Sequence, residues 1–189
     1  SLFLWKNKQT VVIGTNQNPY SECDVASLLD EGGHLARRRT GGGAVYHDLG
    51  NLNFSFVADK NIYDVKRQMQ VIQKALLNFN LETEVSGRND ITYQGRKFSG
   101  NAFAKTKNQG LHHGTILIKT DGERLQKYLK VKPAKLHKHG VKSVASRVIN
   151  LSEVADITSE NIIPHLIKAF EDVYQGTATV INFNDLCNE

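Results

Sequence analysis

The chain has 189 residues, of which 40% are hydrophobic and 23% are charged, a composition that indicates one globular domain and excludes a disordered polypeptide. Its net charge of +5 and pI of about 9.2 permit anionic ligands, nucleic acid or acidic protein partners. No apolar run approaches the roughly 18 residues of a membrane helix and the start does not resemble a signal peptide, so we expect a cytoplasmic protein that does not bind membranes.

The first part of the chain predicts short strands separated by turns. Residues 10 to 14 (TVVIG) form a β-branched run that ends at a glycine, which is typical of a strand followed by a loop. Asp24 can cap a short helix that extends through Leu29. Residues 44–48 (AVYHD) and 51–57 (NLNFSFV) indicate two further strands joined by a turn, the second with its apolar side chains alternating on one face.

The strongest helix signal covers Asp64 to Asn78, where Asp64 is a suitable N-cap and apolar residues follow the 3.6-residue period. Residues 114–118 (GTILI) indicate a buried strand, and a helix is expected from Glu123 to Leu129. A third helix is expected in residues 158–174, where Pro164 is an obstacle unless the helix begins just before it. Without any internal repeat, these elements predict a single α/β (α+β) domain, with a mixed central sheet and flanking helices.

A hairpin is predicted in DITYQGRKFSG, with its turn at Gln94-Gly95, because glycine accepts the positive φ of a tight turn. A two-residue turn would create four cross-strand pairs, namely Tyr93–Arg96, Thr92–Lys97, Ile91–Phe98 and Asp90–Ser99. Lys97 would then lie in mid-strand with Ser99 on its own side. A lone lysine on a strand is commonly a solvated edge residue, but the small residues Ser99, Gly100 and Ala102 leave room for a ligand.

Residues 37–43 (RRRTGGG) indicate a binding site for an anion. Without side chains, Gly41, Gly42 and Gly43, here called the glycine ribbon, let a ligand lie against the backbone and expose amide groups to it. The three preceding arginines suit carboxylate or phosphate, although alternation along a strand would prevent all three from pointing into one pocket. The spacing matches neither a P-loop nor a GxGxxG dinucleotide fingerprint. A glycine-rich hairpin with solvated arginines is the alternative interpretation.

The histidines carry weaker signals. His47 and Asp48 could be a base with its orienting carboxylate, but neighbouring strand residues face opposite sides, so we expect a structural or ligand-contacting His47 rather than a catalytic one. His112 and His113 meet the same objection as a metal site, and no third ligand stands at a recognisable spacing. No metal site is therefore assigned from the histidines.

Residues 126–143 contain six lysines and two histidines without any acidic residue. The segment could be a solvated face or mobile loop, or it could attract phosphates or an acidic partner. Because Tyr128 is the only aromatic residue among these cations, nucleic acid is not the expected partner.

Several segments, in order and at suitable spacing, resemble the lipoate-protein ligase A family: LFLWKN, VVIGTNQNPYSEC, LARRRTGGGAVYHDLGNLNFSF, SGRNDI, RKFSGNAF, HHGTILI and SVASRVINLSE. The resemblance spans roughly residues 2 to 175, and RRxxGGGAVxHD followed by K-x-S-G is specific. It implies the fold that this family shares with biotin-protein ligases and class II synthetase cores. It also implies ATP-dependent joining of lipoate to a lysine of an acceptor domain through a lipoyl-adenylate.

The resemblance also implies roles for single residues. Lys97 would bridge the lipoate carboxyl oxygen and the α-phosphate of ATP as the catalytic residue. Arg38 would hold nucleotide and the carboxyl end of lipoate together with the backbone of Gly43, Ala44, Val45 and Tyr46, with His47 as a further contact. Gly41 and Gly42 would leave space for the acyl chain. Asn89 and Asp90 would line the nucleotide side, with Asp90 a weak candidate for placing Mg²⁺.

The implied partners are the lipoyl domains of 2-oxoacid dehydrogenase E2 subunits or the glycine cleavage H protein. Two alternatives stay open: an octanoyl or lipoyl transferase of the same fold, and a non-catalytic lipoate-binding partner subunit. The transferase needs a cysteine nucleophile or a carrier protein, and neither Cys23 nor Cys187 follows the Lys97 motif closely. Neither cysteine belongs to a CxxC pair, so no disulfide or zinc site is expected.

We expect residues 1 to 189 to form one catalytic domain that lacks the family's first strand and helix and its C-terminal accessory domain. Met69 is the only methionine and the chain starts at Ser1, so we expect it to be incomplete at both ends.

Overall fold

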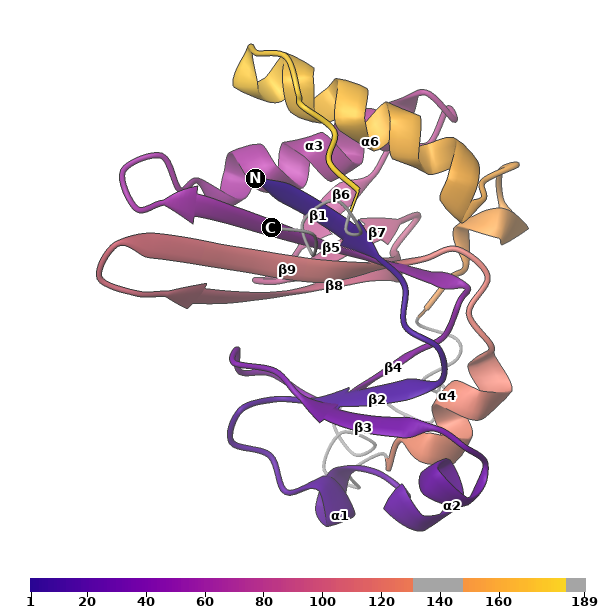
Figure 1. Ribbon diagram of the computed structural model, residues 1–189. Helices are drawn as coiled ribbons and strands as arrows, with labels where there is room; N and C mark the ends of the chain where they lie inside the picture. Colours follow the sequence, from indigo (N-terminus) through magenta and orange to yellow (C-terminus); the bar gives the residue numbers. More distant parts are fainter. Residues whose placement is uncertain (131–147, 183–189) are drawn as a thin grey trace.

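The computed structural model describes residues 1–130 and 148–182 (Figure 1). It contains a six-stranded sheet in the order β1-β5-β9-β8-β7-β6 and a three-stranded sheet in the order β3-β2-β4. The strands are β1 (Leu2–Trp5), β2 (Thr10–Ile13), β3 (His34–Arg37), β4 (Val45–His47), β5 (Asn51–Asp59), β6 (Glu84–Ser86), β7 (Asp90–Tyr93), β8 (Arg96–Lys105) and β9 (Gln109–Leu117). The helices are α1 (Pro19–Glu22), α2 (Val25–Asp30), α3 (Val65–Leu77), α4 (Gly122–Tyr128), the 3₁₀ helix η2 (Leu151–Glu153) and α6 (Ser159–Tyr174). The predicted α+β class, with a sheet flanked by helices, is confirmed. The central six-stranded sheet is antiparallel rather than mixed, and the parallel pair β2–β3 lies in the three-stranded sheet.

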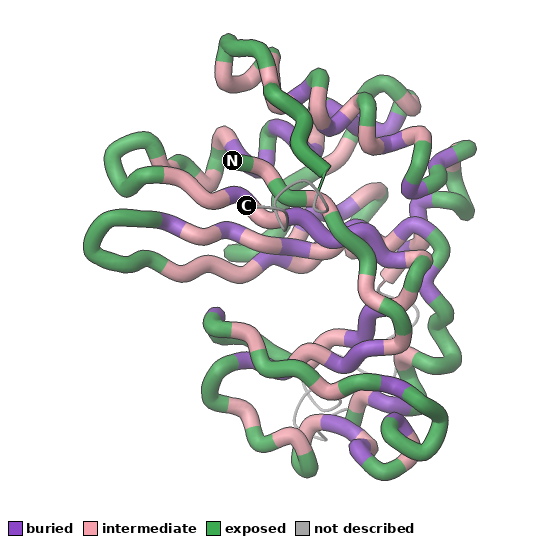
Figure 2. The backbone as a smooth tube through the Cα atoms, viewed as in Figure 1, coloured by how far each residue is buried: buried purple, intermediate pink, exposed green. Residues whose placement is uncertain are grey.

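The two faces of the six-stranded sheet differ in what covers them. Helices α3 and α6 lie over one face, and the three-stranded sheet lies on the other side with α1, α2 and α4 (Figure 1). Leu52, Phe54 and Phe56 of β5 point into the core beneath α3 and α6, as their alternation predicted. The intervening residues Asn53 and Ser55 therefore belong to the opposite face, toward the three-stranded sheet. We call it the helix-free face because α3 and α6 do not cover it. Figure 2 shows buried residues along the middle of this sheet and exposed ones at the tip of the β8–β9 hairpin.

Both long helices follow from local signals. The N-cap Asp64 of α3 accepts hydrogen bonds from the amides of Lys66 and Arg67, and the predicted apolar stripe of the helix is buried. Helix α6 begins at Ser159 after the N-cap Thr158 and runs through Pro164, so the expected obstacle does not break it. Burial of three residues on its inner side, Ile162, Leu166 and Ala169, offsets the hydrogen bond that the proline cannot donate. None of the helices in the described part of the chain is long and apolar enough to span a membrane.

The β7–β8 hairpin departs from the predicted register. Tyr93 pairs with Arg96 and Thr92 with Lys97, as expected, around a turn in which Gln94 and Gly95 both have positive φ. Beyond that point the predicted pairs Ile91–Phe98 and Asp90–Ser99 are wrong, because Ile91 pairs with Ser99 and Asp90 pairs with Gly100. Phe98 is the extra residue of a β-bulge on β8. Both Phe98 and Ser99 are fully buried, so packing of two consecutive residues selects the bulge.

The three-stranded sheet has its own small core. Strand β2 pairs in parallel with β3 and antiparallel with β4, which confirms the strand predicted at residues 10–14. The predicted short helix after Asp24 is α2, whose first turn this residue caps. The core residues of this layer are Val11, Ile13, Cys23, Val25, Leu28, Tyr46 and Tyr128. Strands β4 and β5, neighbours in the chain, lie in different sheets, so the turn between them connects two layers.

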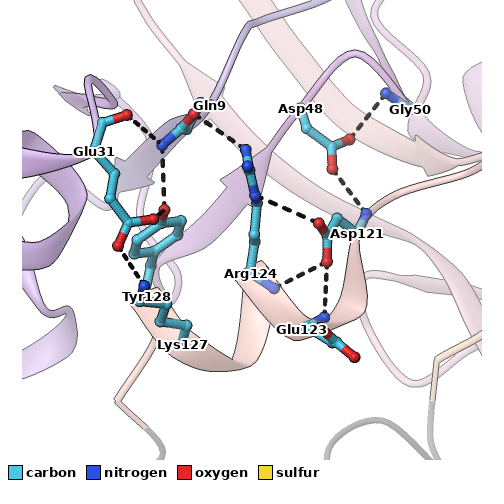
Figure 3. A network of polar contacts seen from close by, with 9 residues as sticks. All are labelled: Gln9, Glu31, Asp48, Gly50, Asp121, Glu123, Arg124, Lys127 and Tyr128. Carbon is cyan, nitrogen blue, oxygen red and sulfur yellow. Dashed lines mark hydrogen bonds and ion pairs between the residues drawn. The ribbon is translucent and has the colours of Figure 1, made fainter.

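A polar network joins this layer to the turn between β4 and β5 (Figure 3). Glu31 after α2 accepts hydrogen bonds from Tyr128 and Lys127 of α4. Gln9 donates to the Glu31 carbonyl and accepts from Arg124. The carboxylate of Asp48 accepts from the amides of Gly50 and Asp121 at 2.9 and 2.8 Å. Of the lysine-rich segment 126–143, residues 131–143 lie outside the described residues, and Cys187 does as well.

Candidate active site

The glycine ribbon connects the three-stranded sheet's strands β3 and β4 and is exposed along its whole length. A Cβ atom added to Gly41 or Gly43 would meet nothing within 4 Å. Backbone hydrogen bonds between loops of the described residues do not use the amides of Gly41, Gly42 or Gly43. The ribbon therefore offers accessible N–H groups, which is the property that an anion site requires.

Gly14 supports the ribbon from behind. A Cβ atom at Gly14 would stand 2.3 Å from the carbonyl oxygen of Gly42, so only glycine permits this approach. Gly42 itself has a φ of 98°, a conformation that other residues rarely adopt. This role of Gly14 was missed in the sequence analysis, which interpreted the residue only as the end of a strand.

Arg38 braces the ribbon from within. Its guanidinium donates to the carbonyl oxygens of Gly41 (2.9 and 3.2 Å), Gly43 (2.7 Å) and Val12 (3.0 Å). These four hydrogen bonds leave one of its five N–H groups for another partner. Burial lowers the pKa of Arg38, although a guanidinium remains charged at neutral pH. Arg38 thus supplies positive charge at the ribbon, and direct contact with a ligand would use the remaining N–H or replace one of these bonds.

Arg37 is bonded to a different loop, in line with the expectation that the three arginines would not share one pocket. Arg37 donates from Nη1 to the carbonyls of Gly14, Thr15 and Gln17 at 2.7 to 3.1 Å. Arg39 is exposed. Arg37 therefore fixes the loop that contains Gly14, whereas Arg38 bonds to the ribbon itself.

Lys97 lies on the helix-free face of the six-stranded sheet. Its ammonium is 2.7 Å from Oδ1 of Asp90, and both side chains are about one-third exposed, at 37% and 34%. The same ammonium is 2.9 Å from the position that a Cβ atom of Gly100 would take. The bulge at Phe98 explains this placement, because it turns Lys97 to the side of Gly100 and Asp90. The expectation that Ser99 shares the side of Lys97 is therefore wrong: Ser99 is fully buried and pairs with Ile91, whereas Lys97 pairs with Thr92 on the other face.

Asn89 holds the start of β7 in place. Its side chain donates to the Asn101 carbonyl at 3.1 Å, and its own carbonyl accepts from the Asn101 amide and side chain. The Asn101 side chain continues to His112, whose ring also contacts Gln68 of α3 at 3.0 Å. The side-chain amide of Asn89 therefore holds the start of β7 against β8, directly before Asp90.

The residues after the ribbon are only partly accessible. The side chain of Tyr46 is buried against Tyr128, with 5.4 Å between ring centroids. The backbones of Val45 and Tyr46 pair with Val12 and Val11 of β2. Of the segment from Gly43 to Tyr46, this leaves Gly43 and Ala44 outside the ladder, with backbone that a ligand could reach.

Among the described residues, His47 does not pair with Asp48, and no histidine belongs to a cluster of metal ligands. Nδ1 of His47 is 3.0 Å from the Asn7 amide nitrogen, whereas Asp48 accepts from backbone amides, so the expectation that they do not pair is confirmed. Burial lowers the pKa of His47 to about 4, with further contributions from the charges of Arg38 and His113. Within residues 1–130 and 148–182 no three His, Cys, Asp or Glu side chains gather as metal ligands.

His113 connects the ribbon with the six-stranded sheet. The hydroxyl of Thr40, the residue before the ribbon, is 2.5 Å from Nε2 of His113 on β9. His113 pairs with Ser55 and therefore lies on the helix-free face, as does Thr115, which pairs with Asn53. Thr115 accepts a hydrogen bond from the Gly100 amide at 3.2 Å. The ribbon and Lys97 are thus brought to the same side of the sheet, although 54 positions separate Gly43 from Lys97.

Sequence comparison finds close relatives. A family model described as the lipoyl protein ligase A/B catalytic domain matches residues 1–171. The lipoate-protein ligase A of Bdellovibrio bacteriovorus is 49% identical over 184 residues, which is 95% of this chain and 54% of the relative. The chain spans about half the length of the curated relatives it matches.

Solved structures show the same fold. An archaeal bipartite lipoate protein ligase from Thermoplasma acidophilum, studied with its E2 lipoyl domain, matches 98% of this chain and 76% of its own with a TM-score of 0.84 and 30% identity. Plasmodium falciparum LipL1 in complex with lipoate matches 99% of this chain and 54% of its own, with a TM-score of 0.84 and 43% identity. A lipoate-protein ligase A bound with ATP matches 98% and 78%, with a TM-score of 0.82 and 28% identity.

Proposed function

The chain belongs to the lipoyl protein ligase A/B catalytic-domain family, and on that premise we propose that its protein joins lipoate to a lysine of an acceptor domain in an ATP-dependent reaction. The relatives named as lipoate-protein ligases support this activity, and so do related structures with lipoate and with ATP. We propose that residues 1 to 189 form the catalytic domain and that the protein works in the cytoplasm.

One observation carries the proposal: the glycine ribbon and the Lys97 ammonium lie on the same side of the six-stranded sheet. Thr40 and His113 join the two regions by a 2.5 Å contact. The ribbon supplies accessible amides with the Arg38 charge behind them, and Lys97 supplies a second cation. A ligand that touches both regions would meet positive groups from two directions. Two anions that must be brought together need such groups, because positive charge offsets their mutual repulsion.

In the first step, a carboxylate oxygen of lipoate attacks the α-phosphorus of ATP. The bond to the β-phosphate breaks, pyrophosphate leaves, and lipoyl-adenylate forms. Lys97 would exchange its contact with Asp90 for contacts with the carboxyl oxygen and the α-phosphate, where charge grows in the transition state. Donors aimed at developing charge in this way lower activation barriers by about 3 kcal/mol each.

The other site residues would hold the substrates. Arg38 and the backbone of Gly43 and Ala44 would face the phosphate and carboxyl groups, while Gly41 and Gly42 leave space for the acyl chain. Val45 and Tyr46 would support this segment from the ladder, with His47 beside it. Asn89 would act on the nucleotide side through the conformation it gives to the start of β7.

In the second step, the ε-amine of the acceptor lysine attacks the acyl carbon of the adenylate. The amide bond forms, AMP leaves with the electron pair of the broken bond, and the amine gives up a proton. The reaction needs no covalent enzyme intermediate. We propose the lipoyl domains of 2-oxoacid dehydrogenase E2 subunits, or the glycine cleavage H protein, as acceptors. The related archaeal ligase was studied with an E2 lipoyl domain, which supports the first of these.

Mg²⁺ would enter with ATP, which it normally accompanies, and would neutralise phosphate charge. Asp90 is the carboxylate next to Lys97, and it is engaged with that ammonium. Since Mg²⁺ is usually held by one or two carboxylates together with substrate phosphates, Asp90 fits as a partial ligand at most. The described residues offer no ready-made cluster for the metal.

The transferase alternative is not favoured. Cys23 is fully buried in the core of the three-stranded layer, its Sγ donates to the Pro19 carbonyl at 3.1 Å, and burial raises the pKa of the thiol. Such a thiol is a poor nucleophile. A transferase could also take the acyl group directly from a carrier protein, without a cysteine nucleophile. The experiment described next distinguishes that reaction from ATP-dependent ligation.

The test incubates the whole protein with lipoate, apo acceptor domain and ATP, and measures acceptor mass and released pyrophosphate. The proposed ligase modifies the acceptor only when both lipoate and ATP are present, with pyrophosphate released in equal amount. Transfer from an acyl carrier protein without ATP would instead identify a transferase. Lipoate binding without any acceptor modification would identify the non-catalytic partner subunit.

A further inference from the structure

Thr40 is a buried hydroxyl residue at the edge of an exposed loop. It is 2% exposed, whereas the three glycines that follow are all exposed. Its Oγ1 lies 2.5 Å from Nε2 of His113, a residue 73 positions further along the chain. We propose that His113 is a positioning residue: through the Thr40 hydroxyl it holds the glycine ribbon at a fixed distance from Lys97.

Among residues 1–130 and 148–182, the other contacts that hold the ribbon lie inside the three-stranded layer. Arg38 ties the ribbon to the Val12 carbonyl of β2. The Thr15 amide donates to the Thr40 carbonyl at 3.0 Å, and Gly14 packs against the backbone of Gly42. These contacts shape the ribbon, but they do not set its distance from the six-stranded sheet, which carries Lys97.

The Thr40–His113 contact reaches that sheet close to Lys97. His113 and Thr115 are two residues apart on β9, so their side chains share the helix-free face at a spacing of about 7 Å. Thr115 accepts from the Gly100 amide, and the Lys97 ammonium lies over Gly100. A short path of contacts therefore runs from Thr40 through His113, Thr115 and Gly100 to Lys97, within a single sheet after its first step.

The environment of His113 suits a neutral positioning group. Burial and the charge of Arg38 lower the pKa of His113 to about 4, so the ring is uncharged at neutral pH. A neutral imidazole has one N–H and one lone pair, and a hydroxyl can both donate and accept. The contact can therefore form with either tautomer, and it adds no further charge beside Arg38.

The effect of His113 on turnover rests on the proposed function, whereas its effect on the position of the ribbon does not. Two measurements separate them. Backbone ¹⁵N order parameters of residues 40–44 report whether the ribbon is held, with or without activity. Lipoate-dependent exchange between pyrophosphate and ATP, measured on the whole protein, reports adenylate formation.

The variants are Thr40→Val, Thr40→Ser, His113→Leu and the double variant Thr40→Val/His113→Leu. Thr10→Val is the matched control, because Thr10 is a buried threonine of the same layer whose hydroxyl donates to the Lys8 carbonyl. Urea unfolding of each variant shows whether it is folded. His113→Asn, whose polar side chain ends short of the position of Nε2, replaces His113→Leu if the latter does not fold.

We expect Thr40→Val and His113→Leu to lower the order parameters of the ribbon from about 0.85 to below about 0.6. The same variants should lower kcat by about 10- to 100-fold, with a smaller change in the KM for ATP. The double variant should be no worse than either single variant, and Thr40→Ser should restore the order parameters and bring kcat to within about threefold of the original protein. Unchanged order parameters in the single variants, or independent effects that multiply in the double variant, would overturn the proposal. Lowered order parameters in a protein without adenylate formation would support the contact between Thr40 and His113 and reject the ligase function instead.

Discussion

Lys97 and Gly100 lie on the same face of the six-stranded sheet although three positions separate them, because Phe98 is the extra residue of a β-bulge. An unbroken strand would place residues 97 and 100 on opposite faces. The bulge therefore delivers the Lys97 ammonium above a residue with no side chain, beside Asp90. This geometry leads to the first prediction.

Gly100→Ala should reduce adenylate formation while leaving the fold intact. The new methyl group would stand 2.9 Å from the Lys97 ammonium and 3.0 Å from its Cε, which is closer than such atoms can approach. Because Lys97 is flexible, it would swing away at little cost in stability, and we expect a loss of rate of about 10- to 100-fold. Gly122→Ala is the control, since a Cβ atom there meets nothing within 4 Å. Equal activity of the two variants would contradict the placement of Lys97.

Lys97→Ala should abolish adenylate formation and barely change the melting temperature. The pair with Asp90 is about one-third exposed, so its loss should cost well under about 1 kcal/mol of folding free energy. Removing a cation from the transition state should cost about 3 kcal/mol or more in activation, which is over 100-fold in rate. Lipoate-dependent pyrophosphate exchange and thermal unfolding measure the two effects. Turnover at the original rate would remove the central role of Lys97.

Arg38→Lys should loosen the ribbon although it keeps the charge. A lysine cannot reproduce the four hydrogen bonds that the guanidinium makes to Val12, Gly41 and Gly43. Leaving these carbonyls with fewer partners should lower the free energy of unfolding by about 1 to 3 kcal/mol, as measured in urea. Arg39→Lys, at the exposed neighbouring position, should change it by less than about 0.5 kcal/mol. Similar values for both variants would mean that Arg38 does not brace the ribbon.

The free energy of unfolding should fall as the pH is lowered from about 6.5 toward 4. Burial lowers the pKa of His47 and His113 to about 4 and that of His112 to about 3. Each histidine takes up a proton in the unfolded chain near pH 6.5, before it does so in the folded protein, so acid favours the unfolded state. Their stabilising contribution is complete above pH 6.5 and is lost as the pH falls through this window.

Urea unfolding at several pH values tests this dependence. His112→Gln removes one of the three groups, so its stability should fall less steeply with decreasing pH than that of the original protein. The carboxylates contribute to the pH dependence of unfolding in both proteins, so their contribution cancels when the two profiles are compared. Parallel pH profiles would show that His112 is not held neutral in the fold.

Sequence reasoning succeeded where the determining signal is local. Asp64 and the apolar period after it define α3, and Asp24 defines the start of α2, because caps and periodicity act within a few residues. It failed where packing decides. The Gln94-Gly95 turn fixed the first two pairs of the hairpin, but burial of Phe98 and Ser99 together shifted the register beyond them.

The candidate site followed the same division. The glycine ribbon and Lys97 stood out in the sequence as unusual residues, yet only the family resemblance joined them. The contact between Thr40 and His113 spans 73 positions and carries no local signal. Gly14 looked like an ordinary strand end, since its approach to Gly42 depends on how the two loops fold. The turn between β4 and β5 also carries no signal that the two strands belong to different sheets.

The fold keeps two separate hydrophobic cores, one under α3 and α6 and one within the three-stranded layer. Within the described residues, the polar network around Asp48 and the contact between Thr40 and His113 already connect the two layers. A small molecule that touches both the ribbon and Lys97 would add a further connection between them. Calorimetry should therefore record a higher melting temperature of the whole fold when such a molecule is bound.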